Sequence, residues 1–123
     1  MRNFLLLLLL LAASCTMDAL TPTNTTITGE TARVTRVIDG DTIDVQIDGV
    51  GYRVRYIGVN TPESDEVCYR EATNANAVLV DGETVTLVRD VSETDVYGRL
   101  LRYVYVGSEF VNADLVRDGW AES

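Results

Sequence analysis

The chain has 123 residues, is 46% hydrophobic, and carries a formal net charge of −9 because 19 acidic side chains oppose 10 basic ones. This acidity argues against non-specific nucleic-acid binding, whose affinity normally comes from neutralising phosphates, but it is compatible with a local pocket of arginine and metal. Histidine is absent, which excludes histidine-based zinc sites and a histidine general base.

Residues 1–15 have the pattern of a leader segment. Arg2 precedes an apolar run, Leu5–Leu11, that is too short to span a bilayer, and small residues follow it. This order is typical of a secretory signal peptide. The small residues before Cys15 also resemble a bacterial lipoprotein box, in which that cysteine is lipidated and anchors the protein to a membrane. We therefore expect an exported protein, either membrane-anchored or freely secreted.

The rest of the chain divides into a linker and one folded domain. Residues 16–30 are rich in threonine and have no apolar period, so we expect a flexible tether. Residues 31–123 are then a single small domain, which we expect to be a monomer. Cys68 is the only cysteine besides Cys15, so neither a disulfide framework nor a CxxC metal site is expected. We expect Cys68 to be half-buried before a helix.

The domain contains the signals of short strands and two helices. Apolar and polar residues alternate over Thr42–Asp48, and Asp48-Gly49 begins a hairpin turn. Ala72, Ala75 and Leu79 fall on one face of a helix. We predict strands over residues 31–38, 42–48, 52–57, 83–89 and 100–106, and helices over 69–81 and 110–118.

This order predicts an α+β fold that is mainly β. It fits a five-stranded OB-type barrel with one helix inserted after the third strand and a second helix after the fifth. Gly119 follows the second helix, and Trp120 is placed to fold back on its last turn.

Two clusters of oxygen-bearing residues are separated by the second and third predicted strands. The sequence of the first is Asp39-Gly40-Asp41-Thr42, and that of the second is Asn60-Thr61-Pro62-Glu63. Alone, Asp-Gly-Asp is most often a simple turn. It is not an EF-hand loop, because the sixth position is an aspartate rather than glycine and the twelfth is Val50 rather than glutamate. A metal here needs ligands from elsewhere, and a barrel can bring the second cluster beside Asp41.

Two arginines give these clusters a possible chemistry. Arg55 lies between them, and Arg99 ends the later segment Asp95–Arg99. Arginine binds phosphate through two charge-assisted hydrogen bonds, so acids, amides and arginines together suggest metal-assisted cleavage of a phosphodiester. The alternative is exposed charge on a barrel surface, which is how we interpret Arg53.

Five segments resemble those of one known family. They are Val37–Thr42, Arg55–Glu63, Cys68–Thr73, Asp95–Leu100 and Val111–Val116. In order and spacing they resemble the staphylococcal-nuclease-like (thermonuclease) family over nearly all of residues 33–121. The resemblance implies a Ca²⁺-dependent nuclease on an OB-type barrel, cutting DNA and RNA to leave 3′-phosphate ends.

The resemblance also implies roles for residues of the metal site. Asp41 stands at the main carboxylate ligand, and Thr61 at a ligand that acts through its backbone carbonyl. Asn60 stands where the founding nuclease has a calcium-binding aspartate, so it keeps an oxygen and loses a charge. Asp39 would lie near the calcium without binding it directly.

Three further positions match the family's catalytic residues. Glu63 stands at the proposed general base, which activates water. Arg55 and Arg99 stand at the two phosphate-binding arginines.

The chain also departs from the family pattern. It is acidic, unlike the basic founding member, and it stops at Ser123, where the family continues into a third helix. We therefore expect either a minimal domain or a truncated one. A non-catalytic OB-type domain that binds nucleic acid or protein is the main alternative, and a calcium-binding envelope protein is another. Degenerate copies typically lose the arginines or the glutamate, whereas here all three are present.

Overall fold

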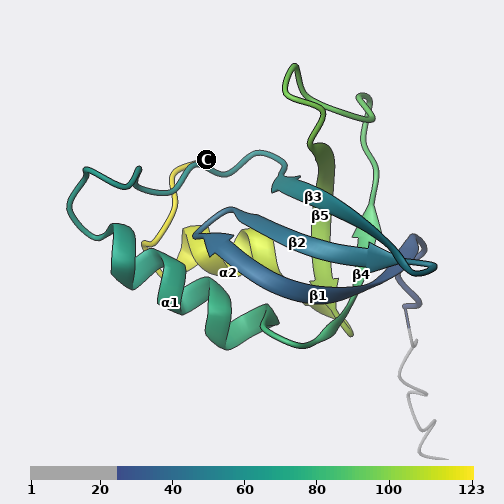
Figure 1. The fold of residues 1–123 in the computed structure, drawn as a ribbon. Helices are drawn as coiled ribbons and strands as arrows, with labels where there is room; N and C mark the ends of the chain where they lie inside the picture. The colour runs from purple at the N-terminus through teal and green to yellow at the C-terminus, as the bar shows by residue number, and fades with distance from the viewer. Residues whose placement is uncertain (1–24) are drawn as a thin grey trace, which may run out of the picture.

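The computed structural model describes residues 25–123 (Figure 1). The predicted leader and lipid-anchor site, and the linker up to residue 24, lie outside the described residues. The elements in chain order are β1 (Glu30–Asp39), β2 (Thr42–Ile47), β3 (Val50–Tyr56), α1 (Tyr69–Val80), β4 (Thr84–Val88), β5 (Leu100–Val106), β6 (Glu109–Phe110) and α2 (Val111–Arg117). Within residues 25–123, no helix combines the length and apolarity needed to cross a membrane.

The strands form one sheet that closes on itself. Their order is β3-β2-β1-β4-β5-β6, and β3 also pairs in parallel with β5, where Val54 is opposite Leu100. The first five strands therefore make a barrel, and the short β6 extends it through pairing of Phe110 with Tyr105. The mainly β α+β fold and the OB-type barrel predicted from the sequence are confirmed.

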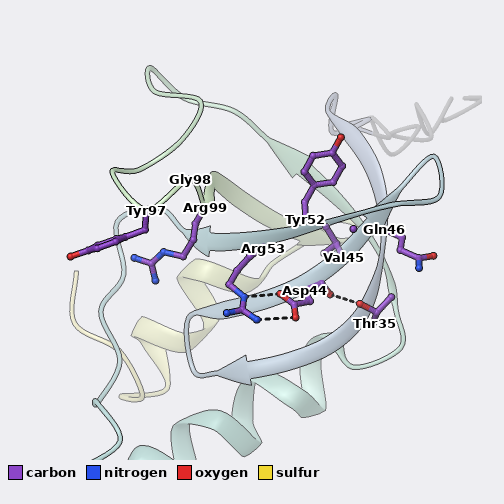
Figure 2. Close-up of a pocket in the computed structure, with 10 residues that line it drawn as sticks. Thr35, Asp44, Val45, Gln46, Tyr52, Arg53, Tyr97, Gly98 and Arg99 are labelled. Carbon is purple, nitrogen blue, oxygen red and sulfur yellow. Dashed lines mark hydrogen bonds and ion pairs between the residues drawn. The ribbon is translucent and has the colours of Figure 1, made fainter.

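The alternating pattern of the strands sorts their side chains between the core and solvent. Ile43 and Val45 on β2 and Val54 on β3 are fully buried. Asp44 on β2 and Arg53 on β3 face outward and pair with each other across the two strands (Figure 2). One face of each strand therefore builds the core while the other is free for polar contacts.

Helix α1 covers β1 at one end of the barrel (Figure 1). Its fully buried residues are Ala72, Asn76 and Val80. The stripe predicted from the sequence differs slightly, since Ala75 and Leu79 are only partly buried against the core. The buried stripe runs at i, i+4 and i+8, and it includes a polar residue that an apolar pattern does not detect.

The ends of the helices show one wrong expectation and one confirmed. Cys68 is exposed, not half-buried, because it precedes α1 with left-handed backbone (φ 67°) at the end of a solvent-facing loop. Trp120 does fold back on α2. The backbone N–H of Trp120 donates to the carbonyl of Leu115 at 2.9 Å. The backbone N–H of Gly119 (φ 81°) donates to the carbonyl of Val116 at 3.1 Å. These are the two bonds of a Schellman cap.

Candidate active site

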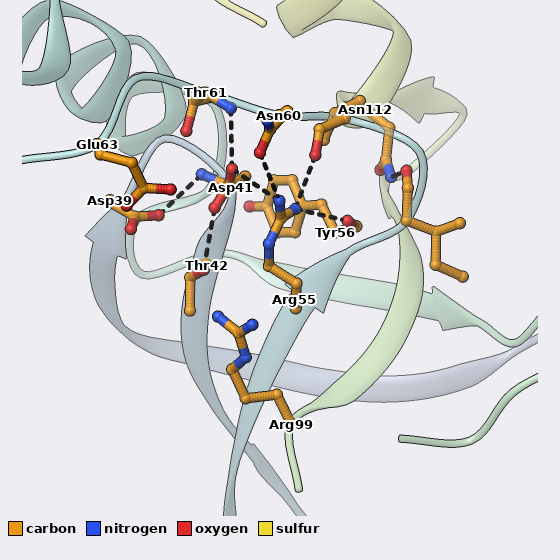
Figure 3. A network of polar contacts seen from close by, with 12 residues as sticks. Asp39, Asp41, Thr42, Arg55, Tyr56, Asn60, Thr61, Glu63, Arg99 and Asn112 are labelled. Atoms are coloured by element: carbon orange, nitrogen blue, oxygen red, sulfur yellow. Dashed lines mark hydrogen bonds and ion pairs between the residues drawn. The ribbon is translucent and has the colours of Figure 1, made fainter. Parts of the chain in front are cut away.

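The turn between β1 and β2 meets the segment after β3 (Figure 3). Asp41 accepts the N–H of Thr61 at 2.9 Å on Oδ2 and the hydroxyl of Thr42 at 3.1 Å on Oδ1. A Cβ on Gly40 would lie 2.7 Å from Cβ and Oγ1 of Thr61, so this close approach requires glycine. We call the assembly of the Asp39–Asp41 turn, Arg55 and the Asn60–Thr61 segment the corner.

Arg55 is the hub of the corner. It stands opposite Thr42 in the β2–β3 register. Its Nη2 lies 3.2 Å from Asp41 Oδ2 and donates to Asn60 Oδ1 at 3.1 Å. Its Nη1 donates to the carbonyls of Tyr56 and Val59, both at 2.8 Å. Only Nε–H lacks an acceptor within the described chain, and the guanidinium is thereby fixed in one orientation.

Two buried asparagines on the helices hold backbone groups in or near the corner, and neither was expected from the sequence. Asn76 of α1 accepts the hydroxyl of Tyr56 at 2.7 Å and donates to the carbonyl of Asp39 at 2.9 Å. Asn112 of α2 donates to the carbonyl of Ile57 at 2.9 Å. A polar residue on the otherwise apolar face of a predicted helix is the signal that could have identified them.

The acidic groups of the corner are crowded. Burial raises the pKa of the Asp39 carboxyl, and the nearby Asp41 carboxylate adds to the increase. A 3.0 Å hydrogen bond from the Asp41 backbone N–H lowers the pKa but only partly offsets these two effects. Glu63 is exposed on the loop after Thr61 and projects toward the same turn (Figure 3). A cation placed here would relieve the repulsion among these carboxylates.

The donor set of the corner fits a hard cation only modestly. No group of three or more Asp, Glu, His or Cys side chains surrounds a common point within residues 25–123. Neutral oxygens, such as the Thr61 carbonyl and the Asn60 amide, would have to complement the Asp41 carboxylate. Such oxygens suit Ca²⁺, but few charged ligands give weak affinity. The Asn60 amide oxygen is held by Arg55, so a cation would compete for it.

The segment Asp95–Arg99 presents the second arginine. Asp95 accepts Nε of Arg99 at 2.7 Å, together with the backbone N–H groups of Tyr97 at 2.9 Å and Arg99 at 3.0 Å. Although burial opposes it, these hydrogen bonds lower the pKa of Asp95. The Arg99 guanidinium lies 5.4 Å from the Tyr97 ring centre and points toward the corner (Figure 3).

A third arginine, unforeseen from the sequence, holds the base of this segment. Arg102 is 1% exposed, and its Nη2 lies 3.1 Å from Glu30 and 2.8 Å from Glu93. Its Nη1 donates to the carbonyl of Glu93 at 3.0 Å. The buried arginine therefore links β1, β5 and the loop before Asp95.

The predicted site residues thus fall into two groups. Hydrogen bonds join Asp41, Arg55, Asn60 and Thr61 into one network. Asp39 lies in the turn of the corner itself and accepts the Asp41 N–H, whereas Glu63 and Arg99 face the network from adjoining loops (Figure 3). Among the described residues, neither Glu63 nor Arg99 hydrogen-bonds to a side chain of the corner.

Comparison with known proteins bears on this arrangement. A family model described as Staphylococcal nuclease homologue matches residues 53–123. A thermonuclease of Staphylococcus intermedius is 39% identical over 106 residues, covering 81% of this chain and 63% of that protein. A thermonuclease of Staphylococcus hyicus is 39% identical over 100 residues, covering 76% and 59%. Endonuclease YncB of Bacillus subtilis (strain 168) is 40% identical over 93 residues, covering 70% and 44%.

The chain spans between 44% and 63% of the length of these relatives. The family match, residues 53–123, covers more than half of the chain. It includes Arg55, Asn60, Thr61, Glu63 and Arg99, and the barrel that positions them is the one that the sequence predicted. The chain therefore belongs to the family of staphylococcal nuclease homologues.

Proposed function

We propose that this protein is a Ca²⁺-dependent endonuclease that hydrolyses DNA and RNA and leaves 3′-phosphate ends. The observation that carries the proposal is the corner itself. Its fixed guanidinium, Arg55, lies against the Asp41 carboxylate and the Asn60 amide oxygen, and a second guanidinium, Arg99, faces it. The nuclease names of the relatives support the same activity.

The site's residues have distinct roles in this reaction. A phosphodiester is negatively charged, and its charge concentrates on the equatorial oxygens as water adds to phosphorus. Arg99 stabilises that charge with its Nη groups, which have no acceptor within residues 25–123, and Arg55 does so through Nε and its fixed positive charge. A Ca²⁺ held by Asp41, the Thr61 carbonyl and Asn60 would supply further positive charge beside the phosphate.

Glu63 accepts the proton of the attacking water. Its exposed position on a loop beside the corner leaves its carboxylate accessible to solvent. The phosphorus–O5′ bond then breaks, O5′ takes a proton from solvent, and the products are a 3′-phosphate and a 5′-hydroxyl. The sequence of residues 1–15 supports export, which would place this activity outside the cytoplasm.

The first test is the metal dependence of the purified full chain on plasmid DNA and RNA. Cleavage should stop with chelator, return with Ca²⁺ and return poorly with Mg²⁺, because Mg²⁺ demands tight octahedral geometry that this donor set does not offer. The products should resist extension by a polymerase until a phosphatase removes the 3′-phosphate. Full activity in chelator would contradict the proposal.

A further inference from the structure

A concave surface lies on the outer face of β2 and β3, next to Arg99 (Figure 2). It has a volume of about 600 Å³ and is lined by Thr35, Asp44, Gln46, Arg53, Tyr97 and Arg99, among others. Of its lining residues, Tyr97, Gly98 and Arg99 belong to the loop already described. We call this surface the β2–β3 groove.

Arg53 is the charged centre of the groove. It donates from Nε to Asp44 Oδ1 at 2.8 Å and from Nη2 to Oδ2 at 3.2 Å. Its side chain is 49% exposed, and its Nη1 has no acceptor within residues 25–123. Asp44 therefore orients the guanidinium while leaving donors free toward solvent.

The strand geometry aligns Arg53 with the two arginines of the candidate site. Arg53 and Arg55 are two residues apart on β3, so their side chains leave the same face about 6.6–6.8 Å apart along the strand. The β3–β5 pairing puts Leu100 opposite Val54 and so places Arg99 beside this stretch. Arg55 in the corner and Arg53 in the groove therefore share one face of β3, and Arg99 lies beside that strand.

The groove offers groups that suit a nucleotide strand. Thr35 and Gln46 are exposed and polar, and Tyr97 is 81% exposed at the Arg99 end. The face of strands two and three is the general oligonucleotide-binding face of OB folds. Within residues 25–123, each of the three arginines has one carboxylate partner, and both Arg53 and Arg99 have guanidinium N–H groups without an acceptor.

From this arrangement we infer that the β2–β3 groove binds the single strand next to the scissile phosphate, with Arg53 contacting the neighbouring phosphate. Arg53 is then a substrate-binding residue, whereas Arg55 and Arg99 act on the reacting phosphate. The inference rests on the proposed function and adds to it the path of the strand. It predicts that longer substrates gain affinity from Arg53 and that a substrate with one phosphate does not.

The test compares wild-type and Arg53→Ala chains on two substrates. One is a single-stranded oligonucleotide of mixed sequence, and the other is the nitrophenyl ester of thymidine 5′-phosphate, which has a single phosphodiester. For the oligonucleotide, Arg53→Ala should raise KM about 3- to 10-fold. This is the loss expected for one charge-assisted hydrogen bond to phosphate that is weakened by exposure to solvent. For the nitrophenyl ester, KM should not depend on residue 53.

Salt dependence makes the test specific for a phosphate contact. For the oligonucleotide, the slope of log(kcat/KM) against log salt should become shallower by about 0.7, the value for one contact on a single strand. Arg117→Ala is the matched control. Arg117 is also an exposed arginine paired with carboxylates, but it lies on α2, outside the groove. Its removal changes the net charge equally and should leave the slope unchanged.

The outcomes separate this inference from the proposed function. If the wild type cleaves both substrates and Arg53→Ala shifts neither KM nor the salt slope, the groove inference is overturned and the nuclease proposal stands. If the wild type cleaves neither, the same oligonucleotide is labelled with a fluorophore and its binding is measured by anisotropy. Binding that weakens in Arg53→Ala would support the groove and overturn the nuclease proposal, whereas no binding would overturn both.

Discussion

The corner around Arg55 and the loop around Arg99 both pair an arginine with an aspartate, but they are built differently. Arg55 is 19% exposed and bonds to groups from the turn, the strand end and the following segment. Arg99 is 31% exposed, and Asp95, its only carboxylate partner in the described chain, is four residues away. The first guanidinium is part of the fold, and the second is carried by a self-contained loop.

This difference separates two contributions that a catalytic arginine can make. Removing Arg55 takes the cation from the Asp41 carboxylate, which keeps only the Thr61 N–H and the Thr42 hydroxyl, and takes the side-chain donor from two backbone carbonyls. Both fold and chemistry should therefore suffer. Removing Arg99 leaves only Asp95, which still accepts two backbone N–H groups. The same substitution should therefore give a different ratio of rate loss to stability loss in the two regions.

The largest effect is expected for Arg55→Ala. The rate should fall by at least about 10²–10³, the loss typical of one transition-state donor. The free energy of unfolding should fall by about 2–4 kcal/mol, because an almost buried ion pair loses one partner. Steady-state kinetics and urea denaturation measure the two quantities. A variant with wild-type stability would show that Arg55 is not structural.

For Arg99→Ala we expect a similar rate loss, about 10²–10³, with a change in unfolding free energy below about 1 kcal/mol. The loop keeps its backbone hydrogen bonds to Asp95, so the folded state is little affected. The two measurements are those used for Arg55→Ala. A stability loss as large as that of Arg55→Ala would end the distinction between corner and loop.

Glu63→Gln tests the proton transfer from water and leaves both arginines in place. The amide cannot accept a proton, so we expect a rate loss of about 10² with unchanged unfolding free energy, because Glu63 is exposed. Calcium affinity, measured by calorimetry, should stay at the wild-type value. Full activity of this variant would remove Glu63 as the general base.

The smallest effect is expected at the third aspartate–arginine pair, on the surface. The hydrogen bond from Arg53 lowers the pKa of Asp44 below its usual 3.8. The pair therefore stabilises the fold above about pH 3.8, and this contribution is lost as the pH falls through the lowered pKa. Asp44→Asn should reduce the unfolding free energy by less than about 1 kcal/mol at neutral pH. In denaturation experiments, the difference in unfolding free energy between wild type and Asp44→Asn should shrink as the pH is lowered. A difference that does not change with pH would exclude the ion pair as its cause.

The sequence alone determined the fold class, and it predicted which residues make up the candidate site. Alternation over residues 42–48 and the glycines that end turns and helices report local backbone geometry, which neighbouring residues largely decide. The residues Asp41, Arg55 and Thr61 could be singled out because they belong to short sequence motifs whose order and spacing are visible in the sequence. Their roles in catalysis are still predictions.

Only the tertiary structure decided how these residues are held. Gly40 is needed for its contact with Thr61, and Asn76 reaches the carbonyl of Asp39, 37 positions away. Arg102 occupies an inward-facing position of β5 because Glu30, 72 residues away, neutralises it. Local periodicity carries no information about partners that far apart. Barrel closure alone brings them together, and buried polar groups then need those partners to offset the cost of leaving water.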